Sequence, residues 1–462
     1  MAKTRTTYVC QECGHQERKW LGKCPTCNAW NTLVEEVERK AVNTKAKGRP
    51  APGARSVQKA APITEVTVEK LGRLPLDMGD LDRVLGGGLV QGALTLIGGE
   101  PGVGKSTLLL SVAYTLAKAG QRVLYVSAEE SVSQTRLRAE RLGALHDKLY
   151  LLSETDMDVV MQEVDRVSPD AMVLDSVQTV YAPELDAAPG SVSQVREVTS
   201  KMMHLAKGQD ISCFIVGHVT KEGSLAGPRT LEHMVDTVLA FESTRGGPFR
   251  ILRAHKNRFG SVSEIAVFEM RGEGLSPIDN PSAIFLAERP KDAPGSVVTA
   301  CVEGTRPLLV EVQGLCSQSA FGNPRRTTQG VDGTRTSLVT AVLEKRCGLE
   351  LAGNDLFINV AGGVSVAETA ADLPIALAVA SSLQNRPLPP GLLAFGEVGL
   401  SGEVRGVQHT EARLHEAAKL GFTSVVLPAS GVERVEAPKG VALMPVKTLE
   451  EALDAALGRY EA

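Results

Sequence analysis

Residues 99–106 restrict the possible folds of this chain more than any other feature of its sequence. They match the pattern G-x-x-x-x-G-K-[ST] in full. The apolar segment Ala93–Ile97 before them predicts a buried strand, and Ser106–Ala119 after them predicts a helix. A glycine-rich loop between a strand and a helix turns backbone N–H groups and the positive helix end towards phosphate. The motif therefore predicts a P-loop that binds ATP.

The residues of this motif have separate expected roles. Lys105 is expected to neutralise the β- and γ-phosphates of ATP, and Ser106 to ligate Mg²⁺. The nucleotide-binding set comprises Gly99, Glu100, Pro101, Gly102, Val103, Gly104, Lys105, Ser106 and Thr107.

Acidic residues elsewhere complete the expected ATP-hydrolysing site. Asp175 ends the apolar segment Ala171–Leu174, which predicts the second acid on the Mg²⁺ side; the alternative is a capping residue at a helix start. Glu129 and Glu130 follow the apolar segment Arg122–Val126, a predicted strand beside the P-loop strand. Either glutamate can orient the attacking water. The alternative is a pair of solvated acids at the start of a helix.

The alternation of strands with helices indicates the fold class. Cys213–Val216 continues this alternation to about Ile278, which predicts a parallel sheet covered by helices on both faces. The region from about Pro294 to the end has apolar segments of its own. They are expected strands at Leu308–Val312, Leu356–Val360 and Ser424–Pro428, and expected helices at Leu373–Leu383 and Thr448–Leu457. We therefore expect a second, mixed α/β domain.

Four cysteines near the N-terminus predict a zinc module. Cys10 and Cys13 form one C-x-x-C pair, and Cys24 and Cys27 form another. Four thiolates suit tetrahedral Zn²⁺, and a segment this short needs the metal in order to fold. The alternatives are two disulfides or accidental spacing. No ligand position is left open, so we expect a structural rather than a catalytic metal.

Composition limits where the chain works and what it binds. Its net charge is −4, so nucleic-acid binding requires a local basic surface. No apolar run is long enough to span a membrane, and none follows the basic N-terminus as in a signal peptide. We expect a cytoplasmic protein that binds no membrane. Residues 39–59 include basic residues and no acidic one, which predicts a solvated tether or, alternatively, a basic arm on nucleic acid.

Two further motifs indicate a family. The segment Leu81–Leu89, which runs into the P-loop, resembles the opening of RecA- and KaiC-type ATPase domains. Together with the four cysteines and the motif Lys256-Asn257-Arg258-Phe259-Gly260, it makes the whole chain similar to the bacterial RadA (Sms) family of DNA repair proteins. This resemblance implies a zinc finger over residues 1–34, a basic linker over 35–64, a RecA-like ATPase over 65–280 and a Lon-protease-like domain over 281–462.

The resemblance also implies a function. Members of the family are homo-hexameric rings that bind single-stranded DNA and move along it using ATP. They process branched recombination intermediates together with the RecA recombinase. By motif position, Glu129 would activate the attacking water. His218 would sense the γ-phosphate at the start of a DNA-contacting loop.

Lys256 and Arg258 are open to two interpretations. In a ring, they can supply positive charge to the ATP bound by a neighbouring subunit, as arginine fingers do. Alternatively, they contact the DNA backbone, and nearby Arg250 and Arg253 enlarge the same basic patch. We favour the interface role.

The C-terminal region resembles a protease domain without its catalytic pair. Gly396–Val404 is similar to a stretch of the Lon protease domain, whose members use a Ser–Lys pair. Ala370 falls where the serine would be, and Glu411 where the lysine would be. We therefore expect no peptidase activity and a role in ring assembly. Three arginines offer DNA contacts or, alternatively, are ordinary solvated surface: Arg325, Arg326 and Arg335.

Three classes of function are thus compared. They are a DNA-dependent ATPase and translocase for recombination, a KaiC-like signalling ATPase without DNA, and an ATP-dependent Lon-like peptidase. The zinc module and the 256–260 motif favour the first class over the second, and the missing Ser–Lys pair argues against the third. Zinc and ATP follow from the residues themselves, whereas DNA dependence follows from the resemblance.

Overall fold

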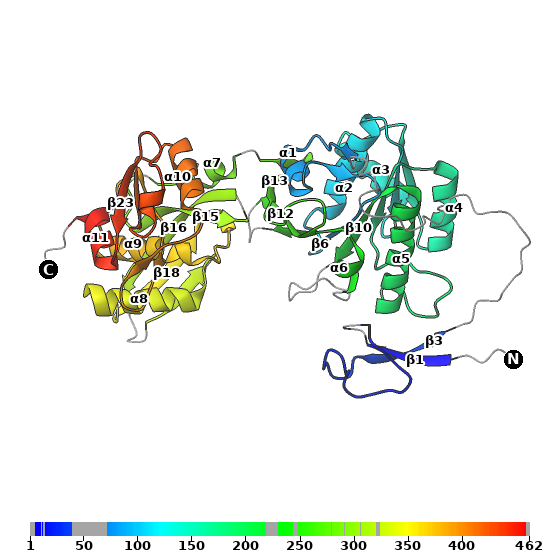
Figure 1. The fold of residues 1–462 in the computed structure, drawn as a ribbon, viewed down its shortest axis with the longest axis horizontal. Coiled ribbons are helices and arrows are strands. Elements are labelled where there is room, and N and C mark those ends of the chain that lie inside the picture. The colour runs from blue at the N-terminus through cyan, green and yellow to red at the C-terminus, as the bar shows by residue number, and fades with distance from the viewer. Residues whose placement is uncertain are drawn as a thin grey trace, which may run out of the picture. The chain divides into compact units, whose positions relative to one another are not determined.

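The computed structural model describes residues 5–38 and 72–458, apart from residues 11, 13, 219–229, 244–247, 279, 291, 305 and 320–323. The chain forms two units (Figure 1). The first unit comprises Met1–Ser243 and Phe249–Pro277, and the second comprises Thr244–Pro248 and Ile278–Ala462. Of the predicted linker over residues 35–64, only residues 35–38 are described, and they belong to a strand.

The first unit is built on a nine-stranded sheet with the order β14-β13-β12-β11-β6-β10-β9-β7-β8. The six strands from β11 to β8 are parallel, whereas β12, β13 and β14 continue the sheet as antiparallel neighbours. The strands are β6 (Leu94–Gly99), β7 (Val123–Ser127), β8 (Leu149–Ser153), β9 (Ala171–Asp175), β10 (Ser212–His218), β11 (Thr237–Ser243), β12 (Phe249–Asn257), β13 (Ile265–Arg271) and β14 (Gly274–Pro277). The predicted parallel sheet is confirmed, and the antiparallel extension is an addition to it.

The position of β7 in this sheet differs from the prediction. Sequence analysis places β7 beside the P-loop strand β6, and this is wrong, because β10 and β9 lie between them. Burial does not distinguish these strands, since all five residues of β7 and all five of β9 are buried. The order is set by pairing between distant segments, in which β7 pairs with β8 and β9, and β9 pairs with β10.

Helices cover both faces of this sheet, as predicted. Side chains alternate between the two faces of a strand. Val123 and Tyr125 of β7 therefore join one apolar core with the leucines of α2, whereas Leu124 and Val126 join a second core with α4 and α5. Both layers can be followed in Figure 1. The helices are α1 (Gly79–Val84), α2 (Lys105–Lys118), α3 (Val132–Arg141), α4 (Met157–Val167), α5 (Val192–Gln209) and α6 (Thr230–Met234), and a short hairpin joins β4 (Arg73–Leu74) to β5 (Leu89–Val90).

A small three-stranded antiparallel sheet precedes the ATPase fold. Its strands are β1 (Arg5–Cys10), β2 (Gln16–Glu17) and β3 (Leu33–Glu38), in the order β2-β1-β3. β3 continues to Glu38, beyond the residue 34 at which sequence analysis ends the zinc module. Every residue of β1 pairs with a residue of β3, so the backbone pairing rather than the last cysteine sets the end of the module.

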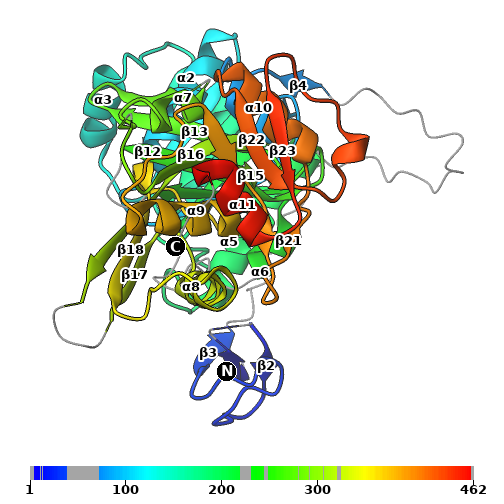
Figure 2. The same cartoon turned by 90° about the vertical axis from the view of Figure 1, so that its left-hand side faces the viewer.

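The second unit has a seven-stranded mixed sheet with the order β17-β18-β16-β15-β19-β22-β23. Figure 2 shows β22 and β23 side by side at one edge and β17 and β18 at the other. The strands are β15 (Ser296–Glu303), β16 (Arg306–Gln318), β17 (Arg326–Gln329), β18 (Asn354–Val360), β19 (Leu392–Ala394), β22 (Ser424–Pro428) and β23 (Ala442–Val446), with a separate hairpin of β20 (Glu397–Val398) and β21 (Val404–Arg405). The mixed α/β character predicted for this region is confirmed.

Five helices pack around the sheet of the second unit. They are α7 (Pro281–Phe285), α8 (Gly333–Cys347), α9 (Asp372–Leu383), α10 (Thr410–Lys419) and α11 (Leu449–Leu457). Leu414 and Ala417 of α10 share an apolar core with Leu309 of β16. α9 crosses β16 at Gly314, where an added Cβ would lie 3.0 Å from the backbone of Ala378. Within the described residues, no helix is both long and apolar enough to cross a membrane.

Candidate nucleotide site and metal centre

The P-loop is held by close backbone contacts that only glycine allows. It connects β6 to α2, and the whole of β6 is buried. An added Cβ at Gly99 would lie 2.3 Å from the carbonyl oxygen of Phe241. Gly104, the N-cap of α2, has φ of 111°, and its Cβ would meet Met270 at 2.7 Å. The spacing of glycines in the motif is therefore dictated by the neighbouring strands as well as by phosphate.

Lys105 lies inside the loop whose phosphate it is expected to neutralise. Its side chain is buried, and its Nζ donates to the carbonyl oxygens of Gly99 at 2.8 Å and Glu100 at 2.9 Å. Burial lowers the pKa of Lys105, while the negative charges of Asp175 and Glu129 oppose that shift. The structure thus brings Lys105, Asp175 and Glu129 into one electrostatic neighbourhood.

Asp175 and Glu129 are joined through a serine that sequence analysis did not single out. Asp175 ends β9 and is buried, and the hydroxyl of Tyr125 donates to its Oδ2 at 2.8 Å. The next residue, Ser176, donates a hydrogen bond to the carboxylate of Glu129. The only sequence signal for Ser176 is its place after Asp175, and alternation along β7 is the only signal for Tyr125.

The neighbouring glutamate, Glu130, points to a different partner. Its carboxylate pairs with Arg138 of α3, and its backbone N–H donates to Ser127 Oγ at 3.2 Å. Sequence analysis leaves Glu129 and Glu130 open as water-activating residues from their position alone. The contacts separate them, because Glu129 is linked to the residue after Asp175 whereas Glu130 is held by helix α3.

The lowered pKa of Lys105 predicts that ATP binding weakens as the pH rises. Only the charged ammonium neutralises phosphate, and its pKa lies below the usual 10.5. The Kd for ATP should therefore rise before the pH reaches that value, which equilibrium titration with a fluorescent ATP analogue can measure. Lys105→Arg is the control, because a guanidinium stays charged throughout this range. Equal alkaline weakening in both proteins would exclude Lys105 as the titrating group.

Lys256 and Arg258 lie at the opposite end of the sheet's strands from the P-loop, where the parallel strands β6 and β11 begin. The backbone N–H of Arg258 donates to the carbonyl of Asp236, whose own N–H donates to Leu94 at the start of β6. The P-loop begins after Gly99, five residues further along β6 and so about 16 Å away at 3.3 Å per residue. Neither Lys256 nor Arg258 therefore serves the nucleotide of its own P-loop.

A buried aspartate, Asp236, binds three groups at that end of the strands. Asp236 is 3% exposed. Its Oδ2 accepts from Leu94 N at 3.0 Å and from Lys207 Nζ at 2.6 Å, and its Oδ1 pairs with Arg258 Nη1 at 3.3 Å. Lys256 Nζ donates to the carbonyls of Glu232 and Val235 near the end of α6. No motif marks Asp236 in the sequence, because its partners come from three distant segments.

The arginines grouped with Lys256 and Arg258 in the sequence are separated in space. Arg250 lies at the P-loop end of β12, and its Nε donates to the carbonyl of Val103 at 3.1 Å. Arg253 pairs with Glu242 at 3.2 Å. The prediction of one enlarged basic patch is therefore wrong for Arg250. Arg250 lies near the first residue of β12 and Lys256 near the last, so the nine-residue strand separates them. His218 ends β10 and pairs in register with Gly99, and its side chain lies outside the described residues.

The N-terminal module brings three of the four predicted metal ligands together. The sulfur atoms of Cys10, Cys24 and Cys27 all lie within 4.8 Å of one another, and those of Cys10 and Cys27 are 3.7 Å apart. Four thiolates around Zn²⁺ at 2.3 Å would be about 3.8 Å apart, so these three fit a tetrahedral zinc site. Cys13 lies outside the described residues. The sulfur atoms of Cys10 and Cys27 are too far apart for a disulfide, whose S–S bond is about 2.05 Å long.

Two matching backbone turns place these ligands. Gly14 N donates to Cys10 O at 2.8 Å, and Asn28 N donates to Cys24 O at 2.9 Å. Gly14 and Asn28 also share a left-handed conformation, with φ of 72° and 62°. Each C-x-x-C pair thus starts a turn of the same design, which explains why a residue that tolerates positive φ follows each pair.

The region aligned with the Lon catalytic pair contains a closed ion pair instead. Ala370 is buried, and Glu411 lies exposed in the first turn of α10. Near these positions in the sequence, the buried guanidinium of Arg413 binds both carboxylate oxygens of Glu368 at 2.8 and 2.6 Å, and its Nε donates to the carbonyl of Gln408. The Glu368–Arg413 pair was not predicted, because neither residue belongs to the Lon motif.

Two of the three arginines considered for DNA contact have partners within the second unit. Arg335 pairs with the buried carboxylate of Asp372, and Arg326 donates to backbone carbonyls around Asn354. Arg325 is exposed. Arg335 and Arg326 therefore serve packing in this unit, and Arg325 remains the most accessible of the three.

Comparisons with known proteins match the parts of this chain separately and as a whole. Family models match residues 8–35 as a rubredoxin metal binding domain, 80–224 as an AAA domain and 319–431 as subunit ChlI of Mg-chelatase. DNA repair protein RadA of Bacillus subtilis is 52% identical over 99% of this chain and 100% of its own length. DNA repair protein RadA of Streptococcus pyogenes serotype M1 is 50% identical over 98% of this chain and 99% of its own. A KaiC-like protein from Pyrococcus horikoshii OT3 shares 18% identity with a TM-score of 0.38, over 45% of this chain and 99% of that one.

The fold and the site define a P-loop ATPase that uses ATP and Mg²⁺ and has a zinc-binding ribbon at its N-terminus. The predicted architecture is confirmed, with a Lon-protease-like α/β domain after the RecA-like core. The chain belongs to the RadA family of DNA repair proteins, since its relatives match it over nearly the full length of both chains. Its role is therefore in DNA repair.

Proposed function

We propose that this chain is a DNA-dependent ATPase that moves along single-stranded and branched DNA during recombinational repair, in the cytoplasm and together with the RecA recombinase. The observation that carries the proposal is the separation of two charged groups along one sheet. Lys105, Asp175 and Glu129 lie together at one end of the strands, and Lys256 and Arg258 lie at the other end. A homo-hexameric ring would bring Lys256 and Arg258 of one subunit to the ATP site of the next. ATP turnover would thereby be coupled to movement along DNA.

Each residue of the proposed site has a specific task in ATP hydrolysis. Lys105 and the P-loop N–H groups bind the phosphates, and Ser106 with Asp175 would hold Mg²⁺, which neutralises charge on the transferred phosphoryl group. Glu129 orients the attacking water and accepts its proton. Ser176 holds the Glu129 carboxylate beside Asp175 through its hydrogen bond, and Tyr125 fixes Asp175 from the other side.

Lys256 and Arg258 are proposed to act on the ATP of the neighbouring subunit. They lie too far from their own P-loop to reach its nucleotide, so a role in hydrolysis requires the ATP of another subunit. Arg258 is 56% exposed at its side chain although it pairs with buried Asp236. The guanidinium is thus both positioned and accessible, as an arginine finger must be.

Arg258→Ala should abolish ATP turnover without changing the salt dependence of DNA binding. Binding would be measured by fluorescence anisotropy of labelled single-stranded DNA across a range of salt concentrations. If Arg258 contacted a DNA phosphate instead, its loss would lower the slope of log K against log salt by about one unit. Thermal melting checks that the variant keeps its fold, because Arg258 also pairs with Asp236.

The Lon-protease-like domain is proposed to assemble the ring rather than to cleave peptides. Glu368, two residues before Ala370, forms an ion pair with buried Arg413, two residues after Glu411, so no nucleophile or base stands at the two aligned positions. Casein incubated with the full chain, ATP and Mg²⁺ should stay intact on a gel. Ser365 is the nearest serine to Ala370, five residues before it. Cleavage that survives Lys105→Ala and stops in Ser365→Ala would show a peptidase after all.

The translocase function can be tested on a three-stranded DNA junction. Protein with ATP and Mg²⁺ should move the branch point and release a labelled strand, and RecA filaments on the same junction should support that movement. Lys105→Ala is the matched control, since it removes the phosphate-binding charge. Release that proceeds equally without ATP would contradict the proposal.

A further inference from the structure

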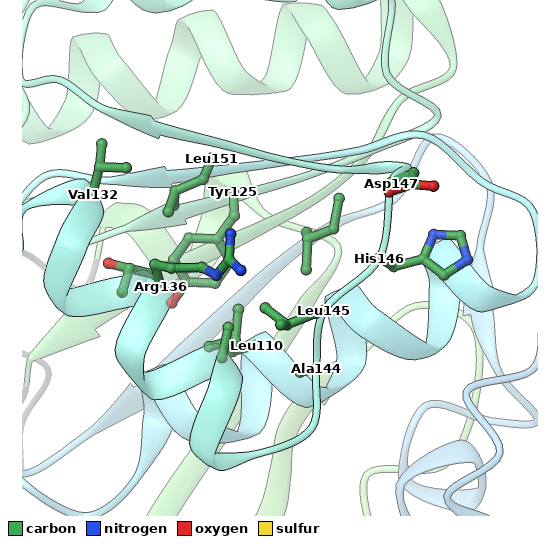
Figure 3. A pocket seen from close by; sticks show the side chains of 12 residues that line it. Leu110, Tyr125, Val132, Arg136, Ala144, Leu145, His146, Asp147 and Leu151 are labelled. Carbon is green, nitrogen blue, oxygen red and sulfur yellow. The ribbon is translucent and has the colours of Figure 1, made fainter.

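A cavity of about 370 Å³ lies beside helix α3, away from the P-loop. It is enclosed by α2, α3, β7, β8 and residues 144–147. Figure 3 shows Tyr125 and Leu151 on the strand side of this space, and Val132 and Arg136 on the side of α3. We call it the α3 cavity.

The walls of the α3 cavity are mainly apolar and its mouth is open. Leu110 and Ala139 line it from inside the core. Val132 and Leu145 line it as well, and they remain 49% and 45% exposed. Small-molecule sites have this character, with volumes of roughly 300–1,000 Å³, apolar walls and a few polar groups.

One polar group in the wall of the cavity has no partner. Thr135 is 1% exposed, and its hydroxyl has no hydrogen-bond partner among the described residues. A threonine inside a helix usually donates to the carbonyl four residues earlier. Here that carbonyl, Ser131 O, accepts from the backbone N–H of Thr135 at 3.1 Å, and the Thr135 hydroxyl makes no bond to it. A buried hydroxyl without a partner is costly, and a ligand in the cavity can supply the missing bond.

Two parts of the cavity wall, Tyr125 and helix α3, are connected to the nucleotide site. The ring of Tyr125 forms part of the wall, and its hydroxyl donates to Asp175 at 2.8 Å. The N-cap of α3, Ser131, lies two residues after Glu129, and Arg138 of α3 pairs with Glu130. A shift of Tyr125 therefore moves a group that holds Asp175, and a shift of α3 moves the residues that directly follow Glu129.

We propose that the α3 cavity binds a free, flat apolar molecule with one hydrogen-bonding atom, and that its occupancy slows ATP turnover. A space between a helix and a sheet, walled by leucines and a tyrosine ring, fits an aromatic ring. The Thr135 hydroxyl selects a ring with a polar atom. The coupling to turnover rests on the proposed roles of Asp175 and Glu129, whereas the binding itself does not.

Phenol and toluene distinguish the two parts of this site, because they share a shape and differ by one hydroxyl. Ligand-observed NMR on the full chain should show saturable binding of phenol, and roughly tenfold weaker binding of toluene, the loss expected for one neutral hydrogen bond. Thr135→Val should bring phenol down to the level of toluene. Leu137→Ala, on the exposed side of the same helix, should leave both affinities unchanged.

A variant at the mouth tests the location without entering the core. Val132→Trp should cover the opening and abolish phenol binding, while the oligomeric state in analytical ultracentrifugation stays that of the wild type. Phenol binding that persists in Val132→Trp, or that is absent from the wild type, would overturn the proposal. Dissociation of oligomers in Val132→Trp would also overturn it, since the occupant would then be a side chain of a second copy.

The coupling is measured separately from the binding. Wild-type protein should lose ATP turnover as phenol is added, with the same midpoint as phenol binding, and Val132→Trp should not respond. Unchanged turnover at saturating phenol would refute the coupling. If the proposed roles of Asp175 and Glu129 are wrong, the binding results above still hold, so the two failures can be distinguished.

Discussion

Glu129→Gln should lower kcat for ATP hydrolysis by about 10²–10⁴-fold, the usual contribution of a general base. Glutamine keeps the size of the side chain and can still accept a hydrogen bond from Ser176, so the site should stay assembled. It cannot take a proton from water. ATP binding should therefore remain close to that of the wild type, because Lys105 and the P-loop are unchanged. Steady-state hydrolysis and equilibrium binding of an ATP analogue together measure this split.

Glu130→Gln is the matched control for that prediction. Glu130 is adjacent in the sequence, but its carboxylate pairs with Arg138 on α3 rather than with a residue of the nucleotide site. Its loss should reduce turnover by less than about tenfold, through the position of α3 alone. A larger loss of kcat in Glu130→Gln than in Glu129→Gln would show that the water-activating residue has been assigned wrongly.

Cys24→Ser should unfold the zinc module and leave the rest of the chain folded. The apolar core of this module consists of Cys10, Cys24 and Leu33, with Tyr8 packed against it. Such a core is too small to fold a segment alone, and zinc binding supplies about 10–16 kcal/mol in comparable modules. The variant should contain no stoichiometric zinc by atomic absorption, and limited proteolysis should remove its first residues quickly.

Cys347→Ser is the control for the zinc prediction. Cys347 is partly buried at the end of α8 and takes no part in the cysteine cluster. This variant should keep the wild-type zinc content and resist proteolysis in the same way. Full zinc content in Cys24→Ser would instead mean that the metal is held without this ligand, contrary to the four-thiolate site.

The features that could be predicted from the sequence are those set by neighbouring residues. The P-loop is a continuous segment whose glycines and lysine act on one ligand, so its strand, turn and helix are all visible in a single stretch. The same holds for the two cysteine pairs, whose matching turns each involve only a few residues. Asp175 at the end of β9 was predictable because a fully apolar strand leads into it.

The features that escaped prediction depend on contacts between distant segments. The order of strands placed β9 and β10 between β6 and β7, although no local pattern encodes which strands pair. Asp236 is important because β6, α5 and the residue after β12 converge on it, at Leu94, Lys207 and Arg258. The Glu368–Arg413 pair likewise joins residues 45 positions apart. Residue type and spacing do not predict such pairs, because in the sequence each member is indistinguishable from a charged residue on the surface.

Steady-state ATP hydrolysis with and without single-stranded DNA tests the proposed function most directly. The purified full chain should hydrolyse ATP faster when DNA is added, and Lys105→Ala should show neither basal nor stimulated turnover. A parallel binding assay should show that the wild-type protein holds the DNA. An ATP hydrolysis rate that does not change when DNA is added, in protein that also fails to bind DNA, would contradict the proposed translocase. It would favour a signalling ATPase with the same fold.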